Sequence, residues 1–365
     1  MTKFSPTLNL IGEFRYSSAS VPCVVLAHNE LEMVKDLVSY YRAFGNVSFL
    51  FVDDRSDDGS TEWLLSQPDV TVFRPVVGSS YAKDKRKWRS ELLDHFASGK
   101  WALVPDADER LIYRDFETRP FTALLSDLDA EGAEAVFCTM VDLYRDGPLS
   151  AQVIDSDSPI SQQFRFFDDP RKAPGTYRFL AAPSRFLRNW PTPPMMITGG
   201  PRDRLFFGGS RAQSKLQSFL WSNIPLLRSV QPTGIGRVRK AIFRRLLKNR
   251  KNRVPDLNLT KLPLLKWKRG SAFYGGAHAV SRHYQLSKET AVLLHYPITK
   301  GTQGVQYVVD RRQHAEQSGY YREILDKSGS DSAEASFRCG ATSEFKSSAD
   351  LEMFFGAKRN LRKSM

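Results

Sequence analysis

The sequence predicts an α/β fold with a mostly parallel central sheet flanked by helices. Short apolar runs alternate with stretches of helical spacing over residues 21–145, which is the pattern expected of such a sheet. Several of these runs stop at clusters of acidic side chains. Right-handed crossovers bring the carboxyl ends of parallel strands to one edge, so we expect these clusters to converge there.

The individual elements follow from the apolar pattern. Residues 21–27 (VPCVVLA) are apolar throughout, as in a strand buried on both faces, and they end at residues 28–30 (HNE). Apolar residues recur at helical spacing over residues 31–44, and the run at residues 47–52 (VSFLFV) predicts a second strand. The remaining elements of this half are a helix at residues 61–66, a strand at 70–73, a helix after the basic segment 81–88, a strand at 101–104, a helix at 121–128 and a strand at 135–141.

The composition is that of a globular protein with a sizeable core, since 41% of the residues are hydrophobic. The formal net charge of +13 indicates an anionic partner, such as a nucleotide, an acidic glycan, a phospholipid surface or a nucleic acid. The three cysteines are widely spaced, and Cys23 and Cys138 lie in apolar runs, which favours buried reduced thiols over a disulfide or a zinc site. No signal-peptide pattern and no membrane-spanning apolar run is present, so we expect a cytoplasmic protein.

Asp106 and Asp108 stand where the strand at residues 101–104 leaves the core. On an extended segment, side chains two residues apart point to the same side, so these carboxylates should lie together. Carboxylates held that close repel unless a cation lies between them or one of them is protonated. Carboxylate oxygens select Mg²⁺ or Mn²⁺, which commonly bridge to a substrate phosphate. A solvated acidic turn is the alternative explanation for this stretch taken alone.

The order of three motifs (AHNE, VDDRSDDGSTEWL and PDADE) resembles glycosyltransferases of the family 2 type with the GT-A fold, in particular a bacterial branch. Later segments (TGGPRDRLFF, LTKLPLLKW, GGAH and LLHYPITKG) are similar to that branch, so the resemblance covers roughly residues 20–300. It implies a Rossmann-like GT-A sheet and transfer of a sugar from a nucleotide-diphosphate sugar to a glycan or lipid-linked acceptor. The expected setting is bacterial surface polysaccharide assembly, with inversion as the predicted stereochemistry and retention left open.

The resemblance assigns the nucleotide base and ribose to Asn29, Glu30 and the pair Asp53 and Asp54. This is chemically reasonable, because carboxylates accept hydrogen bonds from ribose hydroxyls and from ring N–H groups. The alternative for Glu30 is that it favours the N-terminus of the following helix through the helix dipole.

The metal ion is assigned to Asp106 and Asp108, and the resemblance makes His295 the late histidine that completes the site. His295 interrupts an apolar, strand-like run, so a satisfied core histidine is the alternative. His278, which follows two glycines, is the other histidine considered for the site.

Positive charge for the phosphates is expected from the basic segment, including Lys87, and from Arg202 and Arg204 in a glycine-rich loop. A solvated helix face and an ordinary surface turn are the alternatives. Asp142, at the end of a predicted strand, and Asp203, in the same loop as the two arginines, are the candidates for the general base.

Four regions follow from this interpretation: an N-terminal arm (1–20), a nucleotide-sugar-binding α/β half (21–145), a loop-rich acceptor-side region (146–300) and a helical, polar tail (301–365). Residues 237–253 are strongly basic with apolar residues on one helical face, which predicts a helix on an anionic membrane surface at the inner face of the membrane. A nucleic-acid-binding helix or a flexible insertion would have the same pattern.

Three other functions remain open at this point. A nucleotidyltransferase also uses paired aspartates, but residues 28–30 stand where its glycine-rich phosphate loop would be expected. A nucleic-acid-binding protein would account for the charge but not for the acidic strand ends, so no nucleic acid partner is predicted. A non-catalytic sugar-nucleotide-binding protein fits the same residues.

Overall fold

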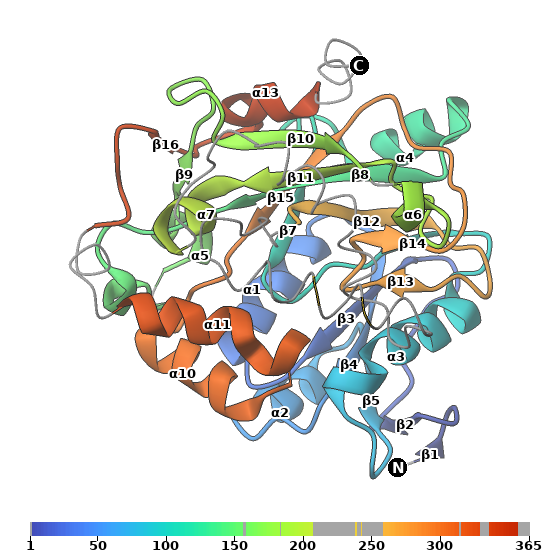
Figure 1. The fold of residues 1–365 in the computed structure, drawn as a ribbon. Helices are drawn as coiled ribbons and strands as arrows, with labels where there is room; N and C mark the ends of the chain where they lie inside the picture. The colour runs from blue at the N-terminus through green and yellow to red at the C-terminus, as the bar shows by residue number, and fades with distance from the viewer. Residues whose placement is uncertain are drawn as a thin grey trace.

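Apolar strands form one large central sheet in the computed structural model (Figure 1). The structure describes residues 2–155, 158–182, 184–206, 238, 242, 258–313, 315–328 and 336–356. Across the sheet the strands are β1 (Thr2–Lys3), β2 (Leu8–Ile11), β5 (Val70–Pro75), β4 (Val47–Asp53), β3 (Val21–Ala27), β6 (Trp101–Leu103), β12 (Thr260–Lys266), β8 (Ala135–Asp142), β15 (Ala291–His295) and β7 (Glu109–Ile112). The predicted α/β class is confirmed.

The sheet is mixed, whereas the sequence predicted a mostly parallel one. β3, β4, β5 and β6 pair in parallel, and β15 is parallel to β8. However, β12 lies antiparallel between β6 and β8, and β7 is antiparallel to β15. The sequence did not predict β7 or β12, because charged residues at the start of each strand, Glu109 and Lys261, make the apolar run short.

Helices cover both faces of the sheet because successive strand residues alternate between them. Val25 of β3 belongs to the core that contains α1 (Leu31–Arg42), and its neighbour Val24 belongs to the core that contains α3 (Tyr81–Phe96). Burial on both faces explains why the central strands are apolar throughout. Two further helices, α2 (Ser60–Ser66) and α4 (Phe121–Ala130), contribute to the α1 core.

One edge of the sheet collects the polar strand ends. β3, β4, β6, β8 and β15 all run in the same direction, so their carboxyl ends lie along this edge. His295, the last residue of β15, is in register with Asp142 on β8 and with Glu109 on β7. Backbone pairing therefore brings together three polar residues from distant parts of the chain.

The predicted regions share one core. β2 of the predicted N-terminal arm pairs with β5 and Leu8 is fully buried, so this segment is the edge of the sheet and not a loose arm. β12 and β15, from the acceptor-side region, complete the sheet. In the tail, α10 (Gly301–Arg311) and α11 (Ala315–Ser328) pack against each other (Figure 1).

The remaining elements are short. They are η1 (Leu149–Ala151), α5 (Ile160–Gln163), β9 (Phe166–Asp168), β10 (Tyr177–Ala181), α6 (Ser184–Leu187), β11 (Met195–Gly199), α7 (Gly200–Phe206), β13 (Phe273–Tyr274), β14 (Ala279–Val280), β16 (Thr342–Glu344), η3 (Ser348–Leu351) and α13 (Glu352–Phe355). β16 pairs with β9, which attaches the C-terminal tail to the acceptor-side region.

Two predictions concern the membrane and the thiols. Within the described part of the chain, no helix is long and apolar enough to cross a membrane. The basic segment 237–253 lies outside the described residues except for Val238 and Ile242, which are helical and exposed (61% and 53%). Cys23 and Cys138 are buried free thiols, as predicted.

Candidate functional site

Asp108, His295 and Asp142 form a chain of contacts at the carboxyl edge of the sheet. Nδ1 of His295 lies 2.6 Å from Oδ1 of Asp142, and Nε2 lies 3.3 Å from Oδ2 of Asp108. The first contact follows from the register between β8 and β15. With Nδ1 held by Asp142, Nε2 is the nitrogen that faces Asp108. Metal-binding histidines are commonly oriented in this way, by a carboxylate on the other ring nitrogen.

Asp142 is buried and both of its oxygens are engaged. Arg202 contacts it in a bidentate arrangement, with Nε 2.6 Å from Oδ2 and Nη2 2.9 Å from Oδ1. Burial alone would raise the pKa of Asp142, but Arg202 and His295 outweigh that effect and lower it. The predicted general base is thus an ionised carboxylate that orients His295, and the predicted nucleotide-binding residue Arg202 is its counter-ion.

His295 carries a proton in this arrangement at neutral pH. Burial lowers the pKa of His295, but the carboxylates of Asp108 and Asp142 outweigh burial and raise it to about 9. Burial likewise opposes ionisation of Asp108, and the neighbouring His295 reverses this and lowers its pKa. A metal ion at Nε2 would have to displace the proton.

Glu109 is a third carboxylate close to Asp108, His295 and Asp142. One ligand atom each from Asp108, Glu109 and His295 lies within 4.8 Å of the others. Glu109 is fully buried, and its Oε1 has no hydrogen bond, although the Lys261 ammonium lies 2.7 Å away. Burial raises the pKa of Glu109 in spite of Lys261. Two carboxylates and an imidazole are ligands that suit a divalent cation of the Mn²⁺ or Mg²⁺ type, which would have to replace the Lys261 ammonium at Oε1 of Glu109.

Asp106 does not belong to this group, although the sequence predicted it as a metal ligand. Nη2 of Arg89 lies 2.7 Å from Oδ1, and the Lys261 ammonium bonds Oδ2. A turn at residues 107–108 interrupts the extended backbone, so Asp106 and Asp108 reach different partners. Burial opposes ionisation of Asp106, but the two cations lower its pKa strongly. A Cβ at Gly276 would lie 2.8 Å from Oδ2, which explains a glycine beside this carboxylate.

Two of the cations near these acids lie on one side of α3. Lys85 and Arg89 are one turn apart and so share a helix face. Arg89 contacts Asp106, and burial lowers the pKa of Lys85 while Asp106 raises it. The predicted phosphate ligand Lys87 lies on the opposite side of the helix with its side chain 56% exposed. The spacing of four from Lys85 was the available signal for Arg89, which sequence reasoning missed.

The loops after β3 and β4 are joined by Asn29. Its Nδ2 donates to Oδ1 of Asp57 (2.6 Å), and its Oδ1 accepts from the Asp57 backbone N–H (2.9 Å). Glu30 is half-buried at the start of α1. Burial raises the pKa of Glu30 to about 7, with Lys300 opposing and Asp108 adding to the rise. Glu30 therefore shares an electrostatic environment with the metal candidate.

The predicted pair Asp53 and Asp54 separates into two roles. Asp53 is fully buried and accepts hydrogen bonds from the Ser56 backbone N–H (3.1 Å), Thr61 Oγ1 (2.8 Å) and Arg74 (2.9 Å), so it fixes the loop. Asp54 instead faces two guanidinium groups. One is Arg55 of the same loop (2.7 Å) and the other is Arg311 of α10 (2.6 Å).

Helix α10 covers these two loops, which the sequence did not predict. The hydroxyl of Tyr307 lies 2.7 Å from Nε2 of His28 and 3.1 Å from Nδ2 of Asn29. Lys300, just before the helix, donates to the Asn29 carbonyl. Together with Arg311 on Asp54, these contacts place α10 over the predicted nucleotide-binding residues.

Three further predicted or considered residues lie outside the group around His295. Arg204 makes a bidentate contact with the buried Asp168 (2.9 Å for each bond). Asp203 is buried and interacts electrostatically with Arg178. Nδ1 of His278 donates to the Thr260 carbonyl (2.7 Å), and burial together with Lys261 lowers the pKa of this half-buried histidine to about 3.

No model of a known protein family matches this chain, and no curated protein is a significant match. A donor set for one divalent cation lies next to buried cations and next to loops rich in carboxylates. Such a site suits a ligand that combines a phosphate-bearing part with hydroxyl groups.

Proposed function

We propose that this chain is a metal-dependent glycosyltransferase of the GT-A type. It would transfer a sugar from a nucleotide-diphosphate sugar to a glycan or lipid-linked acceptor, with inversion, in bacterial surface polysaccharide assembly. The observation that carries the proposal is the group Asp108, Glu109 and His295, oriented by Asp142 at the carboxyl edge of the sheet. The GT-A assignment is supported by the α/β sheet, whose acidic loops follow β3, β4 and β6.

Asp108, Glu109 and His295 would hold a divalent ion. When bound, the ion supplies positive charge that stabilises the leaving nucleotide diphosphate as the sugar C1–O bond breaks. Asp142 keeps Nε2 of His295 aimed at Asp108. Arg89 and Lys85 add positive charge on the α3 side of the same site.

The nucleotide would bind at the loops after β3 and β4. Glu30 and Asp54 offer carboxylate oxygens for hydroxyl and ring N–H donors, and Asn29 holds the loops together. Asp53 supports this surface from below, because its own oxygens are saturated by protein donors. Both predicted bases, Asp142 and Asp203, are buried beside arginines, so a base role for either requires that its partner be exchanged when the acceptor binds.

The net charge of +13 and the exposed Val238 and Ile242 support peripheral contact with an anionic membrane surface through residues 237–253. A lipid-linked acceptor would be met at such a surface.

A thermal-shift panel of nucleoside diphosphates with and without Mn²⁺ tests the proposal. A ligand at a hundred times its dissociation constant stabilises a protein by about 2.7 kcal/mol. We expect a shift with UDP or GDP that needs Mn²⁺ and is lost in Asp108→Asn. The matched control is Asp127→Asn, which changes an exposed aspartate on α4 that pairs with Arg119. This variant should keep the thermal shift. A shift without metal that survives in Asp108→Asn would contradict the assignment.

A further inference from the structure

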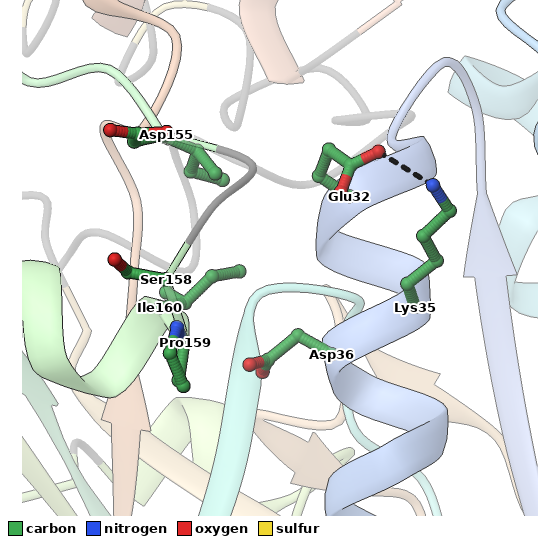
Figure 2. A pocket seen from close by; sticks show the side chains of 8 residues that line it. Glu32, Lys35, Asp36, Asp155, Ser158, Pro159 and Ile160 are labelled. Atoms are coloured by element: carbon green, nitrogen blue, oxygen red, sulfur yellow. Dashed lines mark hydrogen bonds and ion pairs between the residues drawn. The ribbon is translucent and has the colours of Figure 1, made fainter.

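A cavity of about 260 Å³ lies between α1 and the chain around α5 (Figure 2). Glu32, Lys35 and Asp36 of α1 line one wall. Residues 154, 155 and 158–160 line the facing wall, and Figure 2 shows the two walls opposite each other. None of these residues was assigned a role by the sequence.

Both walls continue into the candidate site. On the first wall, Asp36 contacts Arg110 (2.7 Å), which directly follows Glu109 in the chain. On the second wall, the Ile154 backbone N–H donates to the Thr299 carbonyl (3.0 Å), four residues beyond His295. The Arg110 guanidinium also donates to the carbonyls of Ala107 and Glu109 (2.8 and 3.0 Å), so the α1 wall is joined to the loop that carries Asp108.

The wall around residue 158 is fixed without a ligand. The Gln163 side chain accepts from the Asp155 backbone N–H (2.7 Å) and donates to the Asp155 carbonyl (2.7 Å) and to the Ser158 carbonyl. Ile160 anchors the start of α5 in the core, since its side chain is 3% exposed. Hydrogen bonds that already hold Asp155 and Ser158 lower the cost of ordering these two residues when a ligand binds.

The charges of the α1 wall are compensated within the protein. Lys35 pairs with Glu32 (2.8 Å), and Arg110 pairs with Asp36 (2.7 Å). A carboxylate in an ion pair still has lone pairs for hydroxyl donors. Ile154 and Pro159 add apolar surface to the lining. Such a surface suits a neutral molecule with hydroxyl groups and an apolar C–H face.

The size restricts the ligand further. Sites for drug-sized molecules enclose about 300–1,000 Å³, so this smaller cavity fits about one ring. We propose that it is an acceptor subsite that binds one neutral sugar ring of a glycan. This inference rests on the proposed transferase function, because the cavity gains its acceptor role from its position beside the donor site.

Saturation-transfer NMR on the full chain tests the subsite with four probes: the methyl glycosides of glucose, galactose, mannose and N-acetylglucosamine. We expect at least one of them to bind with a millimolar dissociation constant. Ser158→Trp, which fills the cavity, should weaken that binding by about tenfold or more, equivalent to about 1.4 kcal/mol. Ser98→Trp, at an exposed serine in another loop, should leave it unchanged.

A second variant guards against misfolding of the first. Glu32→Ala removes a hydroxyl acceptor from the cavity at an accessible position in the first turn of α1. Its matched control is Glu62→Ala, in the first turn of α2. We expect weaker glycoside binding in Glu32→Ala only, with the nucleotide-dependent thermal shift retained in both variants.

Two outcomes would overturn the subsite: no probe binds the wild-type chain, or binding is unchanged in both Ser158→Trp and Glu32→Ala. Failure of the proposed function would look different. Glycoside binding that depends on Ser158, in a protein without any nucleotide-dependent shift, would leave a carbohydrate site and remove the transferase.

Discussion

The corner around His295 and the corner around Asp54 are both built from carboxylates and arginines, but they are held in different ways. At His295, strands in register supply the contacts, and Asp142 and Arg202 are almost completely buried. At Asp54, a loop and helix α10 supply them, and Tyr307 of that helix is 41% exposed. The sheet therefore positions the residues around His295, whereas the contacts of Asp54 depend on a helix near the C-terminal end of the described chain.

This difference has a functional meaning in the proposed transferase. Groups that stabilise developing charge act best when they are fixed before the reaction. The His295 corner has that property. Contacts at a mobile or weakly packed element are instead the ones that open with little free energy. The α10 contacts occupy side chains that the nucleotide is expected to use, so they are the contacts expected to exchange on binding.

The largest expected effect is that of Arg202→Ala. It leaves the buried Asp142 without its bidentate partner, and removing one member of a buried ion pair costs about 3–5 kcal/mol. Urea unfolding followed by circular dichroism would measure this loss. The matched control is Arg42→Ala, because Arg42 makes the same bidentate contact with Asp69 at the surface. Loss of an exposed pair costs about 0–1 kcal/mol, so equal effects in both variants would break the comparison.

His278 lies in neither corner, and we expect it to have a smaller effect, on the pH dependence of the free energy of unfolding. Its pKa falls to about 3 on folding, so between about pH 6.5 and pH 3 the unfolded chain binds the proton and the folded protein does not. Stability from this residue is therefore present above about pH 6.5 and decreases as the pH falls. From pH 6.5 to 4.5 the loss is about 2–3 kcal/mol.

The free energy of unfolding of wild type and His278→Gln, measured across that pH range, isolates this contribution. We expect a flatter acid dependence in the variant, because glutamine cannot be protonated. His283→Gln is the control, because His283 is exposed. If the free energy of unfolding of wild type and of His278→Gln depended on pH in the same way, folding would not lower the pKa of His278.

The sequence predicted the elements whose residues are apolar throughout. The strand at 21–27 was placed at its observed bounds, and the strand at 135–141 ends within one residue of β8. Both are buried on both faces, so the local pattern carries the whole signal. β7 and β12 were missed because each contains a buried charged residue, Glu109 or Lys261. Lys261 forms ion pairs with Glu109 and Asp106, and these tertiary contacts cannot be read from the local sequence pattern.

Some residues of the candidate site were likewise predicted from the sequence and others were not. Asp108 and His295 were predicted to share a site, and they lie in contact. Glu109 was not among the predicted metal ligands, because alternation along an extended segment would point it away from Asp106 and Asp108. The turn at residues 107–108 changes the direction of the chain. The partners of Arg89 and Arg311 could not be foreseen, because they lie 17 and 257 residues away.

The smallest expected effect on stability is that of Arg311→Ala. Asp54 keeps its contact with Arg55 when Arg311 is removed, so the loss should be below about 1 kcal/mol, in contrast to Arg202→Ala. The sharper measurement is amide hydrogen exchange. Because Arg311 joins α10 to the loop after β4, its removal should speed exchange in residues 301–311 and leave β15 unchanged. If β15 also exchanged faster, the two corners would form one cooperative unit, and α10 would be as much a part of the fixed site as the sheet itself.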